Sequence, residues 1–201
     1  TMVHHLTSAR WSVVIRRIPE TAMATLPIMA VLFIPILLGI GQLYHWSHNN
    51  EADILLQAKT GFLNTPFFVI RSLIYFGIWT VLGFLLYKNS RSHDEDGNPE
   101  TINRMKTISA PGMFLFALSI TFAAFDWMMS LDHHWYSTIF GVYTFAGSFL
   151  AILCFMTLTF AYLRTQNVLD KEVTVEHYHD IGKFTFAFTI FWTYAGFSQF
   201  F

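Results

Sequence analysis

The segment FDWMMSLDHHWYSTIFGVYTFAGSFLA, residues 125–151, joins two long apolar runs through a short polar turn. Two acids, Asp126 and Asp132, and two histidines, His133 and His134, lie within or beside that turn. A turn between two runs that are each long enough to cross a bilayer lies at the membrane surface. Ionisable groups are costly to hold near the membrane interior, and those found there commonly serve ion or substrate traffic. The segment therefore predicts a transmembrane helical hairpin with a candidate functional site at its turn.

The composition extends this prediction to the whole chain of 201 residues, of which 54% are hydrophobic and only 12% charged. A soluble domain usually carries about 25% charged residues. A membrane-spanning helix needs about 20 predominantly apolar residues. Five runs meet that length approximately: 21–43, 63–87, 108–129, 138–163 and 181–201. We predict an all-α fold, with residues 1–201 forming one polytopic transmembrane helical bundle.

Two further features concern the ends of the chain and its first run. The chain opens on polar residues and ends at Phe201 inside an apolar run, so we expect it to be an internal piece of a larger protein. Pro27 and Pro35 lie inside the first apolar run. Because proline removes a backbone donor and clashes with the preceding turn, we expect a bend there.

Lysine and arginine residues predict the orientation of the bundle in the membrane. Nine of them lie before the first span and in the loops after the second and fourth: Arg10, Arg16, Arg17, Lys88, Arg91, Arg104, Lys106, Arg164 and Lys171. The opposite loops contain Lys59 alone. By the positive-inside rule, the residue 1 side is cytoplasmic and the 130–137 turn faces outward. In a bacterial plasma (inner) membrane, the outer side is the periplasm.

Cofactor ligands are scarce in this chain. A single cysteine, Cys154, excludes an internal disulfide and a cysteine-ligated iron–sulfur cluster. All nine histidines lie in loops or at span edges, whereas a haem between spans needs ligands within them. Adjacent histidines on a helix diverge by about 100°, so we also predict no metal site. No nucleotide-binding motif is present, and we expect no nucleic-acid partner.

Arg71 is the basic residue inside the second predicted span, and Asp126 lies near the outer end of the third. An arginine side chain is long enough to reach toward the membrane surface, so these two residues can meet. Two interpretations stay open. One is a buried ion pair that orients helices, and the other is an outer site for proton exit or for a ligand head group.

The remaining candidates for a proton path or ion pair lie at the other edge and within the spans. Glu20, Asp180 and Lys183 stand at the inner edge, where acids are favoured at helix amino ends and a proton-entry mouth is the alternative. Tyr143 and Ser148 supply hydroxyl groups within the fourth span. At the outer turn, Asp132, His133 and His134 are candidates for proton exit or for contact with a partner.

Three segments resemble a known family. FDWMMSLDHHWYSTIFGVYTFAGSF (125–149), WSVVIRRIPE (11–20) and GKFTFAFTIFWTYAGFSQFF (182–201) resemble the NrfD/polysulfide-reductase-type membrane subunits, in particular the ActF type of alternative complex III. His133 departs from the pattern, since many relatives are expected to have proline there. By position in the motif, the resemblance carries a functional role to Asp126 and to the group Asp132, His133 and His134.

The resemblance implies a membrane subunit of a respiratory quinol:cytochrome c or quinol:oxidase oxidoreductase. In that family c-type haems and iron–sulfur clusters belong to partner subunits, a multihaem cytochrome c and an iron–sulfur protein beside a paralogous NrfD-like subunit. A cytochrome oxidase is a further expected partner, and membrane lipid surrounds the spans. The chain itself would supply scaffold and a proton path or a quinone pocket, with no redox centre of its own. A purely structural subunit and a secondary transporter are the two alternatives.

Overall fold

The computed structural model describes residues 1–7, 16–48, 53–166 and 173–199, and every regular element in these ranges is helical. Predicted features that lie outside them are Arg10, Lys171, residues 11–15 of one quoted segment and the last two residues of the fifth predicted span. The α-helices are α1 (Met2–Thr7), α2 (Arg17–Met23), α3 (Leu26–Leu32), α4 (Ile34–Leu38), α5 (Ile40–Leu43), α6 (Ile54–Lys59), α7 (Thr65–Asp96), α8 (Pro99–Trp127), α9 (Phe140–Thr165) and α10 (Val175–Phe197). The short 3₁₀ helices η1 (His45–Ser47) and η2 (Met129–Leu131) complete the described elements. The prediction of an all-α bundle is confirmed.

Proline breaks the first predicted span into pieces. Pro27 and Pro35 occupy the first turns of α3 and α4, where the missing amide hydrogen has no partner to lose. The axis bends by 41° between α2 and the α3–α4 rod. The expected bend is therefore present next to Pro27, whereas Pro35 lies within the α3–α4 rod.

Three described helices, α7, α8 and α9, are each long and apolar enough to cross a membrane, and the bent α2 to α4 rod makes a fourth if it counts as one span. Helix α10 is not among them, because threonine, tyrosine and charged residues lower its mean hydropathy. It also begins at Val175, ahead of the predicted start at 181. By length and composition, three or four of the five predicted spans are supported, which is compatible with an integral membrane protein.

Helices α7 and α8 run well beyond the apolar residues that predicted them. Residues 88–107, expected to be the loop between the second and third predicted spans, are mostly helical. The chain turns at Gly97, which has a positive φ of 61°. Asn98 then caps α8 by accepting a hydrogen bond from the Glu100 amide at 2.9 Å. Hydropathy marks where a membrane would end, whereas a helix stops only where a residue such as Gly97 closes it.

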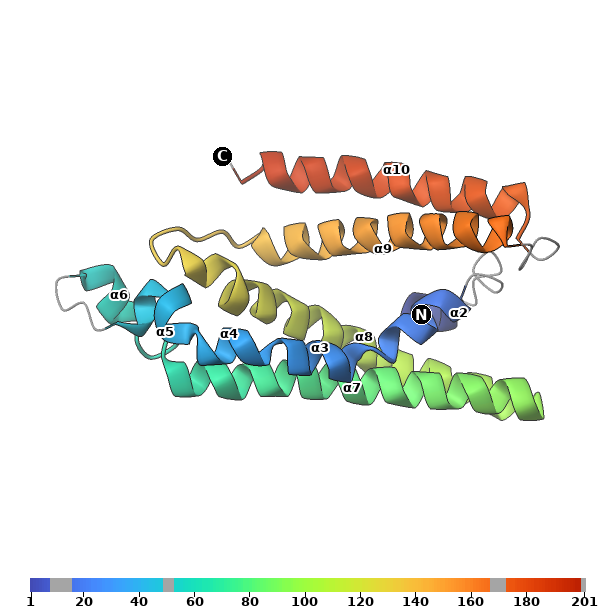
Figure 1. The fold of residues 1–201 in the computed structure, drawn as a ribbon, viewed down its shortest axis with the longest axis horizontal. Helices are drawn as coiled ribbons and strands as arrows, with labels where there is room; N and C mark the ends of the chain where they lie inside the picture. Colours follow the sequence, from blue (N-terminus) through green and yellow to red (C-terminus); the bar gives the residue numbers. More distant parts are fainter. Residues whose placement is uncertain (8–15, 49–52, 167–172, 200–201) are drawn as a thin grey trace.

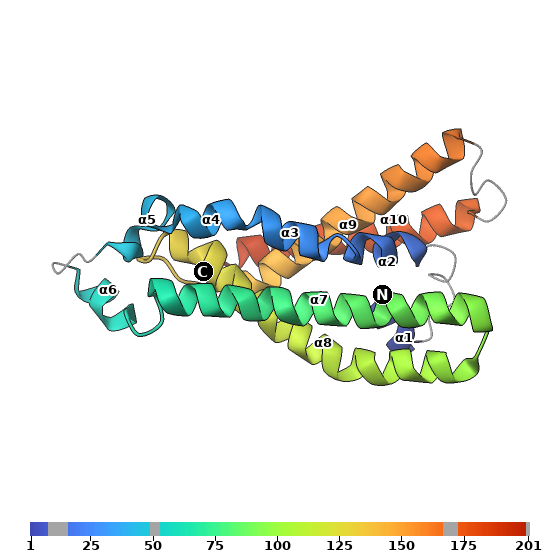
Figure 2. The ribbon, with the colours of Figure 1, turned by 60° about the horizontal axis from the view of Figure 1, so that its bottom comes forward.

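The helices form two pairs. Helix α7 packs along α8, with α1, α2 and α3 against them, and α9 packs along α10, with α8 contacting α9 (Figures 1 and 2). The turn that follows η2 lies at the α6 end of the bundle, and the α7–α8 connection lies at the other end (Figure 1). The predicted outward loops therefore share one end of the molecule.

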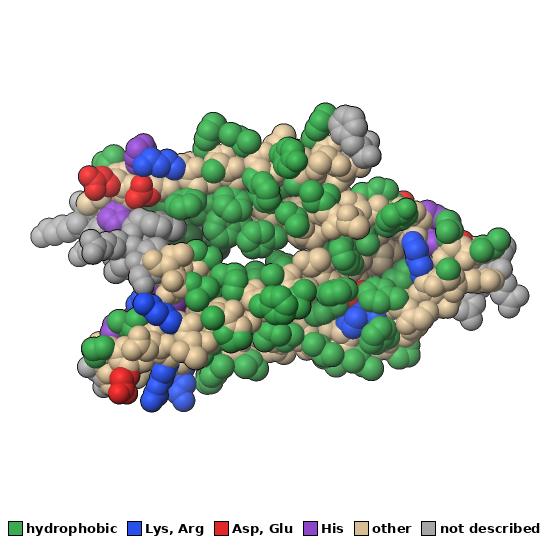
Figure 3. Space-filling view, turned by 180° about the vertical axis from the view of Figure 1, so that it is seen from behind, with side chains coloured by type: hydrophobic (Ala, Val, Ile, Leu, Met, Phe, Trp, Pro, Cys, Tyr) green, Lys and Arg blue, Asp and Glu red, His purple; other side chains and the backbone are tan. Residues whose placement is uncertain are grey.

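The lateral surface is apolar. In Figure 3 hydrophobic side chains cover the middle of the face, and most charged side chains lie toward the two ends. Only 22–28% of the residues in the apolar stretches of α7, α8 and α9 are buried within this chain. The remaining apolar surface is available to lipid or to other protein chains.

Candidate functional site

Arg71 on α7 and Asp126 on α8 form a buried ion pair with two parallel hydrogen bonds. Arg71 Nε donates to Asp126 Oδ2 and Arg71 Nη2 donates to Asp126 Oδ1, each at 2.8 Å. The hydroxyl of Tyr75, one turn further along α7, donates to Oδ2 at 2.7 Å. Asp126 has 0% exposure and Arg71 has 6%. A guanidinium matches a carboxylate in this two-bond geometry, so the pair fixes α7 and α8 in one register.

The rest of the Arg71 side chain is held by the segment that precedes α7 and by its first turn. Nη1 donates to the main-chain oxygen of Phe62 at 3.0 Å. The guanidinium carbon lies 3.9 Å from the ring centroid of Phe62 and 4.1 Å from that of Phe67, which is cation–π distance. Asn64 caps α7 by accepting from the Phe67 amide at 3.0 Å, which fixes the first turn of the helix that carries Phe67. Arg71 is thereby preorganised to meet Asp126.

Aromatic residues pack close to the ion pair at this end of the bundle. Trp127, the last residue of α8, donates from Nε1 to Ser72 Oγ at 3.0 Å, and its main-chain oxygen accepts from the Tyr44 hydroxyl at 3.0 Å. Tyr44 belongs to a buried cluster with Ile40, Trp46, Leu56, Leu63 and Phe68. The cluster joins the α5–α6 region to α7 and packs against Trp127, the neighbour of the fully buried Asp126.

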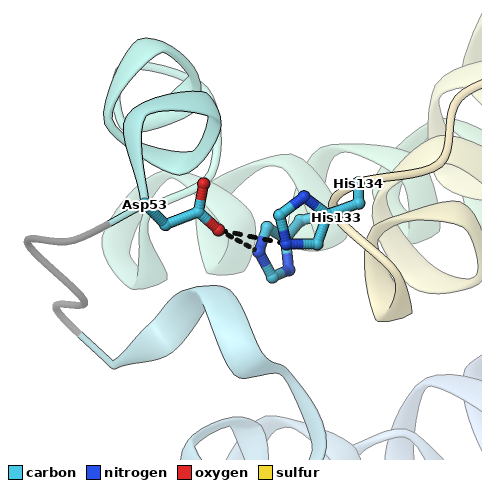
Figure 4. Close-up of side chains that lie close together, drawn as sticks. All are labelled: Asp53, His133 and His134. Carbon is cyan, nitrogen blue, oxygen red and sulfur yellow. Dashed lines mark hydrogen bonds and ion pairs between the residues drawn. The ribbon is translucent and has the colours of Figure 1, made fainter.

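A second cluster lies at the same end and brings together residues that are far apart in sequence. His133 Nε2 is 2.8 Å from Asp53 Oδ2, and His134 Nε2 is 3.1 Å from the same oxygen (Figure 4). The two imidazole centroids are 4.1 Å apart. The predicted divergence of about 100° does not apply, because His133 and His134 lie in a turn and not on a helix. Asp132 lies beside them and accepts a hydrogen bond from the His134 amide at 3.0 Å.

Asp53 was missed by sequence reasoning, although its local role leaves a signal. It precedes an apolar helical run, and its Oδ1 caps α6 by accepting from the amides of Leu55 and Leu56 at 3.0 and 3.1 Å. The hydrogen bond from His133 and the Leu56 amide lower the pKa of Asp53 below its ordinary value. Nothing in the sequence pattern pairs Asp53 with a turn 80 residues away.

Glu20 is buried at the opposite end of the bundle, with 0% exposure. Ser90 Oγ, on α7, donates to Glu20 Oε2 at 2.7 Å. Arg16 Nε is 3.0 Å from Oε1, and Arg17 Nη1 is 3.4 Å from Oε2. Arg17 also pairs with Asp94 near the end of α7. Within the described part of the chain, the Glu20 carboxylate contacts side chains, so it links α2 to α7 and does not act as a helix cap.

The other predicted residues do not join either cluster through the described contacts. Asp180 and Lys183 form an exposed pair at 3.3 Å on α10. The predicted capping role of Asp180 is wrong, because α10 starts at Val175 and is capped by Thr174 together with His177. Tyr143 stacks on Trp192 with ring centroids 5.5 Å apart, and Ser148 is exposed on α9.

No model of a known protein family matches this chain, and no curated protein sequence matches it.

Proposed function

We propose that the chain is an NrfD-like membrane subunit of the ActF type, in a respiratory quinol:cytochrome c or quinol:oxidase oxidoreductase complex. Support for the family comes from the three quoted segments, and support for the membrane location comes from the apolar α7, α8 and α9. In this proposal the haems and iron–sulfur clusters belong to partner chains in a bacterial plasma membrane. The end of the bundle with the α7–α8 connection is cytoplasmic, as the lysine and arginine asymmetry favours.

The first role proposed for the chain is scaffold. Its spans leave most of their apolar surface uncovered within this chain, which suits contact with lipid and with other membrane subunits. The Arg71–Asp126 pair locks α7 to α8 at one end, and Glu20 joins α2 to α7 at the other. A scaffold built in this way keeps its register because two directed polar contacts define it.

The second role proposed is a pair of proton half-channels, and one observation carries it. Two fully buried carboxylates, Glu20 and Asp126, contact α7 at Ser90 and at Arg71. These two α7 positions are 19 residues apart, which is about 28 Å along a helix. That length is close to the thickness of a bilayer core, about 30 Å. One buried acid thus lies near each surface, where protons would enter or leave.

The middle of the bundle favours half-channels over one continuous proton wire. The apolar runs between the two carboxylates contain no Asp or Glu. Their hydroxyls largely serve their own helix: the hydroxyls of Thr185, Thr189 and Thr193 each donate to the main-chain oxygen four residues earlier, at 2.9, 2.8 and 2.8 Å. Transfer between the two ends would therefore require a conformational change, driven by quinol oxidation in the neighbouring subunits.

The purely structural subunit is the second candidate, and one observation favours it. Both oxygens of Asp126 accept hydrogen bonds from Arg71, and Tyr75 adds a third donor. A carboxylate so well supplied with donors is held firmly, as a structural ion pair would be. The transporter alternative has less support, since the charge-poor middle of the spans lacks the polar site that binds solute in such proteins.

Copurification tests the complex. The full-length protein carrying an affinity tag is solubilised in mild detergent and purified from its native membrane. We expect c-type haem absorbance and an iron–sulfur protein to accompany it. A haem-free protein that moves solute when reconstituted would instead support the transporter.

Charge-neutralising variants then separate the proton role from the scaffold role. Asp126→Asn and Glu20→Gln are compared with Glu95→Gln, which changes an exposed acid outside the candidate sites, in complexes that retain their haem content. If the half-channel proposal is right, the first two variants lower quinol oxidation coupled to proton release, and the control does not. Normal turnover and normal proton release in both variants would favour the structural subunit.

A further inference from the structure

The cluster of Asp53, His133 and His134 has the donor set of a metal site. Its three ligand atoms, Asp53 Oδ2 and the two imidazole Nε2 atoms, lie within 4.8 Å of one another. We propose that this cluster binds one zinc-like divalent transition-metal ion at the end of the bundle that carries α6. This inference does not depend on the respiratory role proposed above.

The distances within the cluster agree with a single ion. In a tetrahedral zinc site with ligands at about 2.0–2.1 Å, neighbouring ligand atoms are about 3.3 Å apart. Asp53 Oδ2 lies 2.8 Å from one imidazole nitrogen and 3.1 Å from the other. A small opening of the cluster therefore suffices to place an ion between the three atoms, as their convergence in Figure 4 suggests.

Hydrogen bonds to other atoms of these three residues hold them in place, as is common for metal ligands. Asp53 uses Oδ1 for the amides of Leu55 and Leu56, which leaves Oδ2 to face the histidines. Lys59 Nζ donates to the main-chain oxygen of His133 at 2.6 Å, and Asp132 accepts from the His134 amide at 3.0 Å. These contacts orient the turn without using any of the three ligand atoms.

Exposure favours exchange of the ion with solution. The side chains of Asp53 and His133 are 15% and 13% exposed, whereas that of His134 is 57% exposed. The ion therefore has two shielded ligands and one ligand on an open side, where water completes the coordination. Three protein ligands plus water is the pattern of zinc sites that keep an open position.

The ligand types select the class of ion. Two imidazoles and one carboxylate suit zinc, copper and nickel, whereas calcium and magnesium prefer all-oxygen sites. An ion bound here would join the start of α6 to the turn after η2, two segments 80 residues apart.

The test uses the full-length protein, with its complex intact, stripped of metal by chelator and titrated with zinc by calorimetry. Two variants remove ligands without removing the fold. Asp53→Asn keeps a good helix cap on α6, and His134→Ala changes an exposed side chain. His179→Gln is the matched control, because His179 is exposed on α10.

The wild-type protein and His179→Gln are expected to bind one more zinc ion per chain than the two ligand variants. In the two ligand variants the affinity for zinc is expected to fall by roughly 100-fold, since loss of even a supporting partner of a metal ligand lowers metal affinity by about 10–100-fold. X-ray absorption at the zinc edge should show imidazole scattering in the wild type and less in His134→Ala. Equal stoichiometry and affinity in wild type and His134→Ala, or no zinc uptake by the wild type, would overturn the proposal. If added magnesium lowered the affinity of the wild-type protein for zinc as much as removal of a ligand does, that result would also contradict the proposal.

Discussion

Arg71 and Asp126 face each other across the α7–α8 interface through two hydrogen bonds of 2.8 Å, and both side chains are almost completely buried. Removing charges from water is costly, so such a pair adds little net stability compared with an apolar pair of the same shape. Breaking it is different, because one uncompensated charge is left in the interior. Losing one partner is therefore expected to cost much more stability than losing both.

Arg71→Ala should therefore destabilise the bundle by about 3–5 kcal/mol, measured by equilibrium unfolding in mixed micelles. Arg91→Ala is the matched control, since Arg91 and Glu95 form an exposed pair at 3.9 Å with side-chain exposures of 62% and 71%. The control should cost less than about 1 kcal/mol. Similar costs for the two variants would mean that Asp126 is not held in the way described.

Gly141 is expected to be the position in α9 that least tolerates a side chain. A Cβ atom there would lie 2.5 Å from Thr121 Cγ2 and 3.0 Å from Thr121 Cα, so part of the obstacle is the backbone of α8. Gly141→Ala should lower the free energy of unfolding by about 1–3 kcal/mol through overpacking. Gly77→Ala, where no heavy atom apart from the adjacent residues and backbone of its own helix lies within 4 Å of the added Cβ, should be neutral or slightly stabilising. A neutral Gly141→Ala would show that α8 and α9 are further apart.

The sequence predicts the helices of this protein better than their contacts. Apolar runs locate α7, α8 and α9, and the prolines at 27 and 35 locate the breaks between α2, α3 and α4, because both signals act within a few residues. The length of the fifth apolar run predicted a span, although the threonine, tyrosine and charged residues of α10 lower its mean hydropathy. The helical extension of α7 to Asp96 was not predicted, since it depends on the turn at Gly97.

The contacts within the candidate sites also differ in how well the sequence predicts them. Arg71 and Asp126 could be paired from the sequence because each is the isolated charge near one end of an apolar run. Tyr75 also leaves a signal, since it follows Arg71 by one helical turn and so shares its face. Asp53 leaves none for its partners, because its contact with His133 depends on how α6 folds back over the 132–134 turn. Contacts of that kind are set by tertiary packing.

The burial of His5 predicts that the docking of α1 onto α8 depends on pH. Burial lowers the pKa of His5 to about 4, with the charges of His4, Arg16 and Lys106 acting in the same direction. Its Nε2 is buried with no hydrogen-bond partner among the described residues. When α1 detaches, His5 regains its ordinary value of 6.5. The detached form binds the proton more readily, so the contribution of His5 to docking is fully present above pH 6.5 and decreases progressively as the pH falls toward about 4.

Hydrogen exchange of the α1 amides, corrected for the intrinsic pH dependence, measures this docking. Protection in the wild type should fall as the pH is lowered through this window. In His5→Gln, which cannot take up a proton, protection should be lower at neutral pH and nearly independent of pH. A wild-type protection that stays constant across the window would contradict the prediction.

Cysteine accessibility tests which end of the bundle faces outward. Cys154, the single cysteine, is exposed on the apolar α9 and is first replaced by alanine. Thr138→Cys then places a thiol in the turn before α9, and Asn103→Cys places one near the start of α8, at the opposite end. The lysine and arginine asymmetry predicts that Thr138 is outside and Asn103 inside. A membrane-impermeant maleimide should therefore label Thr138→Cys in intact cells stripped of their outer membrane, and label Asn103→Cys only after permeabilisation. The reverse pattern would invert the orientation and would move the Arg71–Asp126 pair to the cytoplasmic side, where it would serve proton entry.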